Sequence, residues 1–596
     1  MRKLIVLMLA VLTFPAAGIE HPSAHMRDIE KHRLDKPLIT FGDPSREPMA
    51  FTAEHNPVTD RLIFGYLPYW NNGTTHLRYG LLTDLLYFSC GLAAEGALGD
   101  CRGWPESAPI DEAHKYGVRV HLVITGFDSA TVKALIASET QKNTFFANCW
   151  NKVNDANADG LNIDFEGIGS VDTAVLADFF NDLGTYFHTR NSEMIVSAAL
   201  PAVDWSNIWD IDAMTEMDYF FLMLYDYHWK GGDPGPVAPL YSGEPWNTNG
   251  ICVEKSVNTY VSKNGEAIKD KLIAGYPYYG VNWASTSSDI PGTQTADGVS
   301  VLFDSVMSEY AEISSQWDDG SSTSYKIWQE GSQWYQLWYD DGDSLGLKYA
   351  FTKDSGLAGS GMWALNYDIT SEDLWKKIAE NFVNDRSGSV EDPVIIDSFP
   401  FTHTDDTYRY ASDSFDSYKC SGNTYDTSNV NESGPEIIFR FDAPCDGTLT
   451  ATVNAGQGGS GEREDIDIHI LSGGTSEECL IRDDASVSAE LEKGTYFASL
   501  DSYVGENITK GGPFTVTFEF SSCPDSENQP DDDTKADEDD VKDDESEVEA
   551  DENDEDGSDD ADTHDSTSHD EIPSDDSDQD EDPVSKKSGG CSINEI

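Results

Sequence analysis

The chain has 596 residues, 11% of them aromatic, and a formal net charge of -71. This length exceeds one ordinary domain, so we expect two or three folded units and flexible tails. So negative a chain is repelled by phosphate backbones and anionic membrane surfaces, which argues against nucleic acid as a partner.

The first 18 residues have the layout of a secretory signal peptide. Arg2-Lys3 precedes the apolar run Leu4 to Phe14, and small residues follow at positions 16–18. This predicts cleavage after about Gly18 and a protein that is secreted, extracellular or on the surface of a bacterium; a short membrane anchor is the alternative. No other apolar run is long enough to cross a bilayer, and the polar residues 19–60 are interpreted as an N-terminal extension.

From residue 61 to 385, eight apolar runs of strand length alternate with helical stretches. The runs are Leu62 to Trp70, Leu85 to Cys90, Val118 to Phe127, Gly160 to Glu166, Met194 to Ala202, Tyr219 to Tyr227, Lys271 to Tyr279 and Gly361 to Tyr367. Thr173 to Tyr186 has the clearest helical spacing, and Thr370-Ser-Glu-Asp373 resembles a capping box that opens a last helix through Phe382. The alternation predicts an α/β fold, a parallel (β/α)₈ TIM barrel, with an insertion from Ala284 to about Leu345.

The fourth run carries polar residues at alternate positions: Asn162, Asp164 and Glu166. Successive strand residues face opposite sides, so these three would line the barrel interior, with Glu166 nearest the carboxyl-end rim. An uncompensated buried polar group costs roughly 2 to 5 kcal/mol, so stability does not explain the pattern. Crowded carboxyls bind protons more tightly, as a general acid must. A structural hydrogen-bond network or a metal site is the alternative.

These residues carry a resemblance to glycoside hydrolase family 18, the chitinase-like enzymes. Asp159-Gly-Leu-Asn-Ile-Asp-Phe-Glu166 resembles the family signature D-G-x-N-x-D-x-E, and Met223-Leu-Tyr-Asp226 resembles its M-x-Y-D. Phe64 to Trp70 is similar to the first strand of the family, and Gly361-Met-Trp363-Ala-Leu to the eighth. The resemblance covers roughly residues 62–382.

The resemblance implies a retaining reaction in which the substrate's own N-acetyl oxygen attacks the anomeric carbon, with no cofactor and no metal. It makes Glu166 the acid, Asp164 the group that holds the acetamide, and Tyr225 the donor to the acetamide oxygen, while Asn162 positions Asp164. The other candidate substrate contacts are Tyr66, Trp70, Asp226, Trp229, Tyr278 and Trp363, and Trp283 is a further candidate for the rim.

The sequence also departs from the family pattern. Many members have Asp where this chain has Asn162, and the third-strand motif S-x-G-G is replaced by Val123-Ile-Thr-Gly-Phe127. The segment Tyr225 to Pro239 looks closer to the branch that includes spore-cortex-lytic enzymes. We therefore expect a secreted hydrolase of β-1,4-linked N-acetylglucosamine polymers of the chitin type. The alternatives are a peptidoglycan N-acetylglucosaminidase and a non-catalytic sugar-binding lectin.

Residues 392–522 alternate with a period of two between turn signals, which predicts an antiparallel β-sandwich. The segments Phe441 to Thr450 and Asp465 to Ile470 resemble bacterial pre-peptidase C-terminal domains, which implies a carbohydrate-binding or spacer role. Residues 524–583 contain 31 acidic residues against two lysines, so we expect a disordered tail over 524–596.

The nine cysteines form two sets of four and a single Cys591. The first set is Cys90, Cys101, Cys149 and Cys252, and the second is Cys420, Cys445, Cys479 and Cys523. Two even sets in an exported chain predict two separately crosslinked domains, with the pairing open. Zinc is the rival interpretation, but no C-x-x-C spacing supports it. Cys591 follows Gly-Gly and is either the remnant of a surface-attachment signal or an incidental thiol.

Overall fold

The structure is a computed structural model that describes residues 21–37, 59–73, 77–114, 116–248, 250–369, 371, 373–383, 387–407, 414–455, 465–505, 508–509, 511–521 and 523. Within these ranges, no helix combines the length and the apolar character needed to cross a membrane. The predicted signal peptide, the predicted acidic tail and Cys591 lie outside the described residues.

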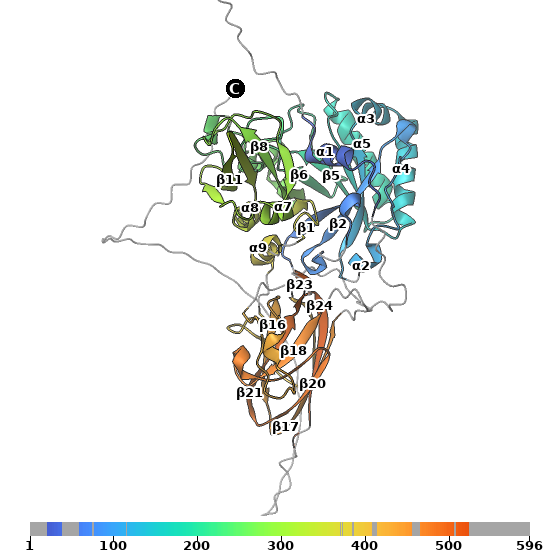
Figure 1. Cartoon of the computed structure of the whole chain (residues 1–596). Coiled ribbons are helices and arrows are strands. Elements are labelled where there is room, and N and C mark those ends of the chain that lie inside the picture. Colours follow the sequence, from blue (N-terminus) through green and yellow to red (C-terminus); the bar gives the residue numbers. More distant parts are fainter. Residues whose placement is uncertain are drawn as a thin grey trace, which may run out of the picture. The chain divides into compact units, whose positions relative to one another are not determined.

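Eight parallel strands close into a barrel in the order β1-β2-β3-β4-β5-β6-β7-β13, with β13 beside β1. Figure 1 labels β1, β2, β5 and β6 of this barrel. They are β1 (Leu62–Pro68), β2 (Asp84–Gly91), β3 (Arg119–Gly126), β4 (Gly160–Phe165), β5 (Ile195–Pro201), β6 (Tyr219–Met223), β7 (Leu272–Pro277) and β13 (Gly359–Trp363). Each of the eight predicted runs supplies one strand, so the predicted TIM barrel is confirmed.

Helices cover the outside of the barrel. They are α2 (Ile110–His114), α3 (Ser129–Ile136), α4 (Glu139–Asn154), α5 (Thr173–His188), α6 (Val253–Asn264), α8 (Gly342–Asp354) and α9 (Asp373–Phe382). The Asp172 side chain caps α5 by accepting from the backbone N–H groups of Ala174 and Val175. The outward-facing Phe165 ring of β4 packs against Phe145 of α4 and Phe179 of α5. This packing fixes which face of β4 points inward.

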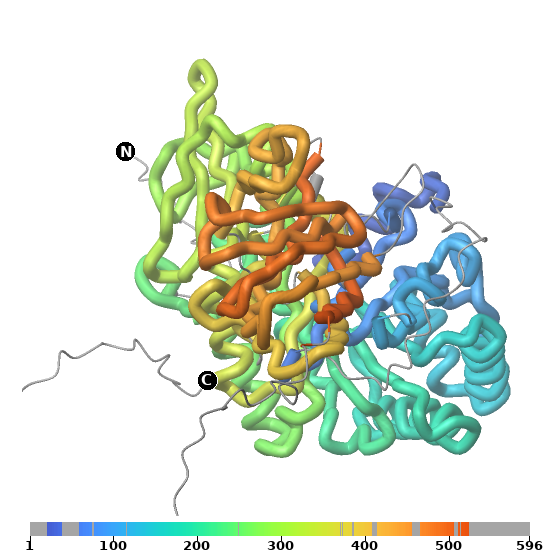
Figure 2. Tube along the Cα trace, turned by 90° about the horizontal axis from the view of Figure 1, so that it is seen from below, coloured from blue at the N-terminus to red at the C-terminus, as the bar shows by residue number. Residues whose placement is uncertain are grey.

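A five-stranded antiparallel sheet is inserted between β7 and α8, in the order β10-β11-β12-β8-β9. Its elements are β8 (Tyr279–Ser285), β9 (Val299–Leu302), α7 (Phe303–Ser308), β10 (Gln316–Asp318), β11 (Thr323–Glu330) and β12 (Gln333–Tyr339). Figure 2 follows this insertion in light green to yellow-green. The insertion begins with β8 at Tyr279, five residues before the predicted Ala284, because β8 pairs with β12 and not with the barrel.

The second folded region is all-β. One sheet has the order β14 (Val394–Ile396), β16 (Glu436–Ala443), β21 (Gly494–Ser502), β18 (Ile466–Leu471), β19 (Cys479–Asp483). The other has the order β15 (Phe401–Asp406), β24 (Pro513–Phe520), β17 (Gly447–Ala455), β20 (Ser486–Leu491). A short hairpin joins β22 (Val504–Gly505) and β23 (Ile508–Thr509). The two larger sheets share one apolar core, which includes Phe439 of the first and Phe518 of the second. This is the two-layer arrangement of a β-sandwich.

The cysteines follow the predicted division only in part. Disulfides join Cys420 to Cys479 and Cys445 to Cys523 in the sandwich, and Cys90 to Cys101 in the barrel. The expected second crosslink of the barrel is not formed, because Cys149 is buried on α4 and Cys252 is the N-cap residue of α6.

Candidate active site

Strand β4 places its polar residues inside the barrel, as the alternation predicts. Asn162 and Asp164 are fully buried, and the Glu166 side chain, just past the end of β4, is 10% exposed. The Asn162 amide oxygen accepts from the Tyr66 hydroxyl at 3.0 Å, and its amide nitrogen donates to Ser197 Oγ at 2.9 Å. The amide is therefore held by β1 and β5, directly below the two carboxyls.

The two carboxyls bind protons unusually tightly. Burial raises the pKa of Asp164 well above its ordinary value. Burial, and after it the negative charge of Asp164, raises the pKa of Glu166 to about 8. Crowding of the two carboxyls was the expected cause, but burial is the larger one. A glutamic acid that keeps its proton near neutral pH suits general acid catalysis.

Tyr225 and Asp226 follow the end of β6. Tyr225 is 4% exposed, and its hydroxyl lies 2.7 Å from Nε2 of His25. The Tyr279 hydroxyl donates to Asp226 Oδ1 at 2.7 Å, and Arg27 donates to both oxygens of Asp226 at 2.8 and 2.9 Å. Burial disfavours the charge of Asp226, but the charge and hydrogen bonds of Arg27, together with the hydrogen bond from Tyr279, outweigh burial and lower the pKa of this carboxyl. Asp226 is therefore an ionised, firmly held group beside the cleft.

The predicted aromatic residues fall into two groups. Trp363, at the end of β13, lies 5.7 Å from Tyr66 and 6.3 Å from Trp70 between ring centroids. Trp229 lines the cleft that Glu166 also lines. Tyr278 is not brought to this group, because its hydroxyl is 3.0 Å from the Tyr349 hydroxyl of α8. Trp283 is fully buried within β8.

Tyr279 takes the place expected for Tyr278. Its hydroxyl reaches Asp226, as described, because the next residue along an extended chain faces the opposite side. The paired tyrosines at 278 and 279 were the available signal, but the sequence alone does not show which of the two faces the cleft.

A cleft of about 660 Å³ opens at the carboxyl ends of β4, β5 and β6, and residues 21–23 and Met26 form part of its wall. Its lining includes Glu166, Tyr225, Asp226, Trp205, Trp209 and Trp229. The volume falls in the ordinary range of small-molecule sites, and the mixture of indole planes with a few polar groups suits pyranose rings.

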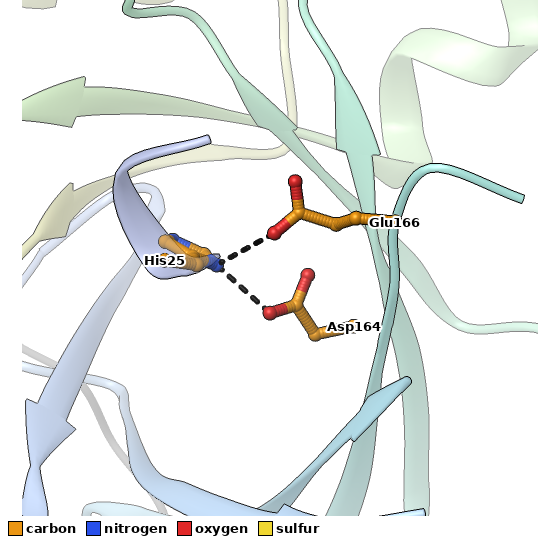
Figure 3. A group of neighbouring side chains, drawn as sticks. All are labelled: His25, Asp164 and Glu166. Atoms are coloured by element: carbon orange, nitrogen blue, oxygen red, sulfur yellow. Dashed lines mark hydrogen bonds and ion pairs between the residues drawn. The ribbon is translucent and has the colours of Figure 1, made fainter. Parts of the chain in front are cut away.

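The sequence reasoning missed the residues of the N-terminal segment, by which we mean residues 21–37. This segment contains α1 (Ala24–Lys31), whose N-cap Ser23 accepts from the Met26 backbone N–H. Ser23 Oγ also donates to Glu166 Oε1 at 2.7 Å, and His25 Nδ1 lies 2.9 Å from Asp164 Oδ2 and 3.9 Å from Glu166 Oε1 (Figure 3). Eight helical residues after a serine cap were a local signal for α1, but nothing in the sequence pointed it at the barrel.

One set of the described residues could hold a metal ion. Ligand atoms of His25, Asp164 and Glu166 all lie within 4.8 Å of one another. The separation of His25 Nδ1 from Asp164 Oδ2 is that of an ordinary hydrogen bond. The geometry as it stands is therefore that of a hydrogen-bonded cluster.

The chain is similar to several known proteins. The chain is 22% identical to the cortical fragment-lytic enzyme of Bacillus anthracis over 319 residues, which are 52% of this chain and 70% of that protein. It is 23% identical to chitinase C of Streptomyces lividans over 235 residues, which are 37% of each chain. A crystal structure of a chitinase from Chromobacterium violaceum overlaps with a TM-score of 0.46 and 20% identity, covering 54% of this chain and 98% of that one.

The sequence model of the family described as glycosyl hydrolases family 18 matches residues 62–368 of the 596. The matched part contains all eight barrel strands and the carboxyl pair at the end of β4. The chain therefore belongs to glycosyl hydrolase family 18 and is a glycoside hydrolase.

Proposed function

We propose that the protein is a secreted hydrolase that cleaves β-1,4 linkages of N-acetylglucosamine polysaccharide of the chitin type. The observation that carries the proposal is the position of Glu166 at the edge of an aromatic-lined cleft, where burial raises its pKa to about 8. Behind it lie a buried Asp164 and the hydroxyl of Tyr225, both within reach of the same imidazole. Two groups so close together can hold the two ends of one small polar substituent, such as an acetamide.

The geometry supports a nucleophile that comes from the substrate. Asp164 and Glu166 project from one strand, about 6.6 Å apart along it, so they approach a sugar from one side. Schemes with two protein carboxylates need one on each face of the ring. The acetamide oxygen at C2 of the sugar takes the place of the second carboxylate.

In the first step, protonated Glu166 donates its proton to the glycosidic oxygen while the bond from that oxygen to the anomeric carbon breaks. The acetamide oxygen bonds to the anomeric carbon and gives an oxazolinium ion. Asp164 binds the acetamide N–H as positive charge develops there, and the Tyr225 hydroxyl donates to the acetamide oxygen. In the second step, the Glu166 carboxylate takes a proton from water, and the water oxygen bonds to the anomeric carbon. The bond from the acetamide oxygen to that carbon breaks, which opens the oxazolinium ring, and the anomeric configuration is retained.

A matched assay with chitin oligosaccharides tests this function. For the assay, a protease recognition sequence is inserted between residues 38 and 58. The protein is cut at this site and the N-terminal peptide is removed before the assay, because residues 21–37 contact both carboxyls. The Glu166→Gln variant should hydrolyse the oligosaccharides at least about 100-fold more slowly, since it keeps the shape of the acid without its proton. Full activity of that variant would remove Glu166 from the role, and binding without cleavage by the wild type would favour a lectin.

Peptidoglycan is the second candidate substrate, as an N-acetylglucosaminidase reaction. Its support is the segment Tyr225 to Pro239 and the similarity to the cortical fragment-lytic enzyme over 52% of this chain. The same acetamide chemistry applies, because peptidoglycan also contains N-acetylglucosamine. Parallel digestion of purified peptidoglycan and chitin oligosaccharides, with mass spectrometry of the new reducing ends, separates the two substrates.

We also infer that the protein is exported. From the resemblance to pre-peptidase C-terminal domains, we infer a sugar-binding or spacer role for the sandwich. Three disulfides are typical of exported proteins, since the cytosol keeps thiols reduced. Attachment to the cell surface through the tail stays a prediction. Deletion of residues 392–522 should spare hydrolysis of soluble oligosaccharides and reduce hydrolysis of insoluble polymer. Equal loss on both would contradict the sugar-binding role.

A further inference from the structure

The N-terminal segment lies across the groups that the reaction needs. Ala24 and His25 are fully buried, although they precede the first barrel strand by more than thirty residues. In Figure 3 the His25 ring points from α1 toward Asp164 and Glu166, which come from β4. A side chain that contacts both carboxyls takes up the space that a sugar acetamide would need there.

Three catalytic candidates are each occupied by a group of this segment. Glu166 accepts from Ser23 at 2.7 Å through Oε1, so one of its two carboxyl oxygens is already hydrogen-bonded. The His25 imidazole contacts the other two catalytic candidates. Its Nδ1 is 2.9 Å from Asp164 Oδ2, and its Nε2 is 2.7 Å from the Tyr225 hydroxyl. These are the two groups assigned above to the N–H and the oxygen of the acetamide. His25 thus makes both contacts expected of that substituent.

The aromatic surfaces are occupied as well. The His25 and Trp363 ring centroids are 3.8 Å apart. His21 stacks on Trp229 at 4.6 Å, and His32 stacks on Trp70 at 4.8 Å, each with an interplanar angle of 6°. Flat rings lie here on the indoles that we predict to carry pyranose rings. The segment therefore covers three of the predicted sugar contacts.

Charged contacts anchor the segment just after His25. Arg27 donates two hydrogen bonds to Asp226, in the bidentate geometry that makes such pairs strong. Asp28 accepts from the Trp363 indole N–H at 3.1 Å and from the Tyr367 hydroxyl at 2.9 Å. A helix that merely covered a barrel end would bury apolar side chains. This one presents polar groups that match the polar groups of the site one by one.

We propose that residues 21–37 are an intramolecular inhibitor, which fills the active site of the intact chain in the manner of a substrate and must leave before a polysaccharide can enter. The inference rests on the proposed function, since a segment can inhibit only a site that acts. Signal-peptide removal after about Gly18 would not release it, because every contact described lies beyond that position. A second cut, within residues 38–58, would make the segment a separate peptide that dilution removes. While the link is intact, the segment competes at an effective concentration of about millimolar.

Activity measurements on matched variants of the full-length chain test the proposal. Wild type, His25→Ala, Arg27→Ala and Arg33→Ala are assayed with chitin oligosaccharides, each intact and after cutting at the inserted site and removal of the peptide. Arg33→Ala is the matched control, because Arg33 is on the same segment, is 57% exposed and pairs only with the exposed Glu30 among the contacts described. We expect the cut wild type to be at least 100-fold faster than the intact one. Intact His25→Ala and Arg27→Ala should be at least tenfold faster than intact wild type, and Arg33→Ala unchanged.

Direct binding of the segment separates this proposal from the assignment of the enzyme. A synthetic peptide of residues 19–37 is titrated into the cut, peptide-free protein by calorimetry, beside its Arg27→Ala and Arg33→Ala forms. Equal activity of intact and cut protein, with no binding of the wild-type peptide, would overturn the inhibitor and leave the hydrolase standing. In another outcome, the cut protein hydrolyses neither chitin oligosaccharides nor peptidoglycan but binds the peptide, and Arg27→Ala weakens this binding at least tenfold while Arg33→Ala does not. That result would keep the docking site and overturn the proposed hydrolase.

Discussion

The burial of Asp164 and Glu166 gives this site its chemistry. Both carboxyls are removed from water, and each consequently binds its proton more tightly than a solvated acid does. The inward direction of these side chains follows from the packing of Phe165 between α4 and α5 on the other face of the strand. The acid is therefore made by a strand that folds for ordinary hydrophobic reasons.

Replacement of Asp164 by Asn should change the pH profile as well as the rate. The Asp164 charge raises the pKa of Glu166, so Asp164→Asn should lower that pKa. Since the acid works only when protonated, activity is lost as pH rises through its pKa. The alkaline limb of kcat/KM in the cut enzyme should thus move to lower pH in Asp164→Asn, with kcat about 100-fold lower. A limb that stays in place or moves to higher pH would contradict the coupling.

Protonation of His25 should weaken docking of the N-terminal segment at low pH. Burial lowers its pKa from 6.5 to about 4, against the charges of Glu166, Asp28 and Asp226, while Arg27 adds to the lowering. A lowered pKa of a base favours docking above the ordinary value of 6.5 and opposes it as pH falls toward 4. The His25→Ala form of the 19–37 peptide should therefore bind less tightly in calorimetry, and its Kd should no longer rise as pH falls from 6.5 toward 4.

At this scale the sequence predicted the residues of β4 well and the residues around them less well. The alternation of Asn162, Asp164 and Glu166 was readable because a strand has a period of two. The choice between Tyr278 and Tyr279 was not, since it depends on where the chain leaves the barrel. His25 was not readable at all, because its partners are 139 and 200 positions away in the chain.

Among the elements, β4 shows how the outer helices support the site. Phe165 is 1% exposed and contacts rings of α4 and α5, whereas Val175 on α5 is 42% exposed. Phe165→Ala should lower the free energy of unfolding of the barrel by about 3 to 5 kcal/mol, because it leaves a cavity between strand and helices. Val175→Ala, the control, should change it by less than about 0.5 kcal/mol. Denaturant titration followed by tryptophan fluorescence measures both.

The predicted elements differ from the structure where long-range pairing decides the outcome. Lys271 to Tyr279 was one run in the sequence, but the structure ends β7 at Pro277 and starts β8 at Tyr279. The first strand pairs with β6 and β13, and the second with β9 and β12. Local apolar pattern is the same on both sides of Tyr278, so it contains no sign of the change of partner.

The described residues form two large apolar cores, one in the barrel and one shared by the two sandwich sheets, and a smaller cluster around Phe415 and Tyr418. The Cys445–Cys523 disulfide closes 78 positions of the sandwich, which stabilises it by roughly 4 kcal/mol in the chain-entropy account. A Cys445→Ser, Cys523→Ser double variant should therefore lower the melting temperature of the sandwich transition in calorimetry. Hydrolysis of soluble oligosaccharides should be unaffected, and a matching fall in the barrel transition would show that the cores unfold together.

Because α1 is part of the same polypeptide as the barrel, each copy synthesised brings one occupant for its own cleft, at a fixed ratio of one to one. During storage or export, a producing cell would then need no separate inhibitor protein to protect its own N-acetylglucosamine polymers from the enzyme. It would also mean that the timing of activity is decided by whichever protease meets the chain outside, and not by the rate of transcription or translation.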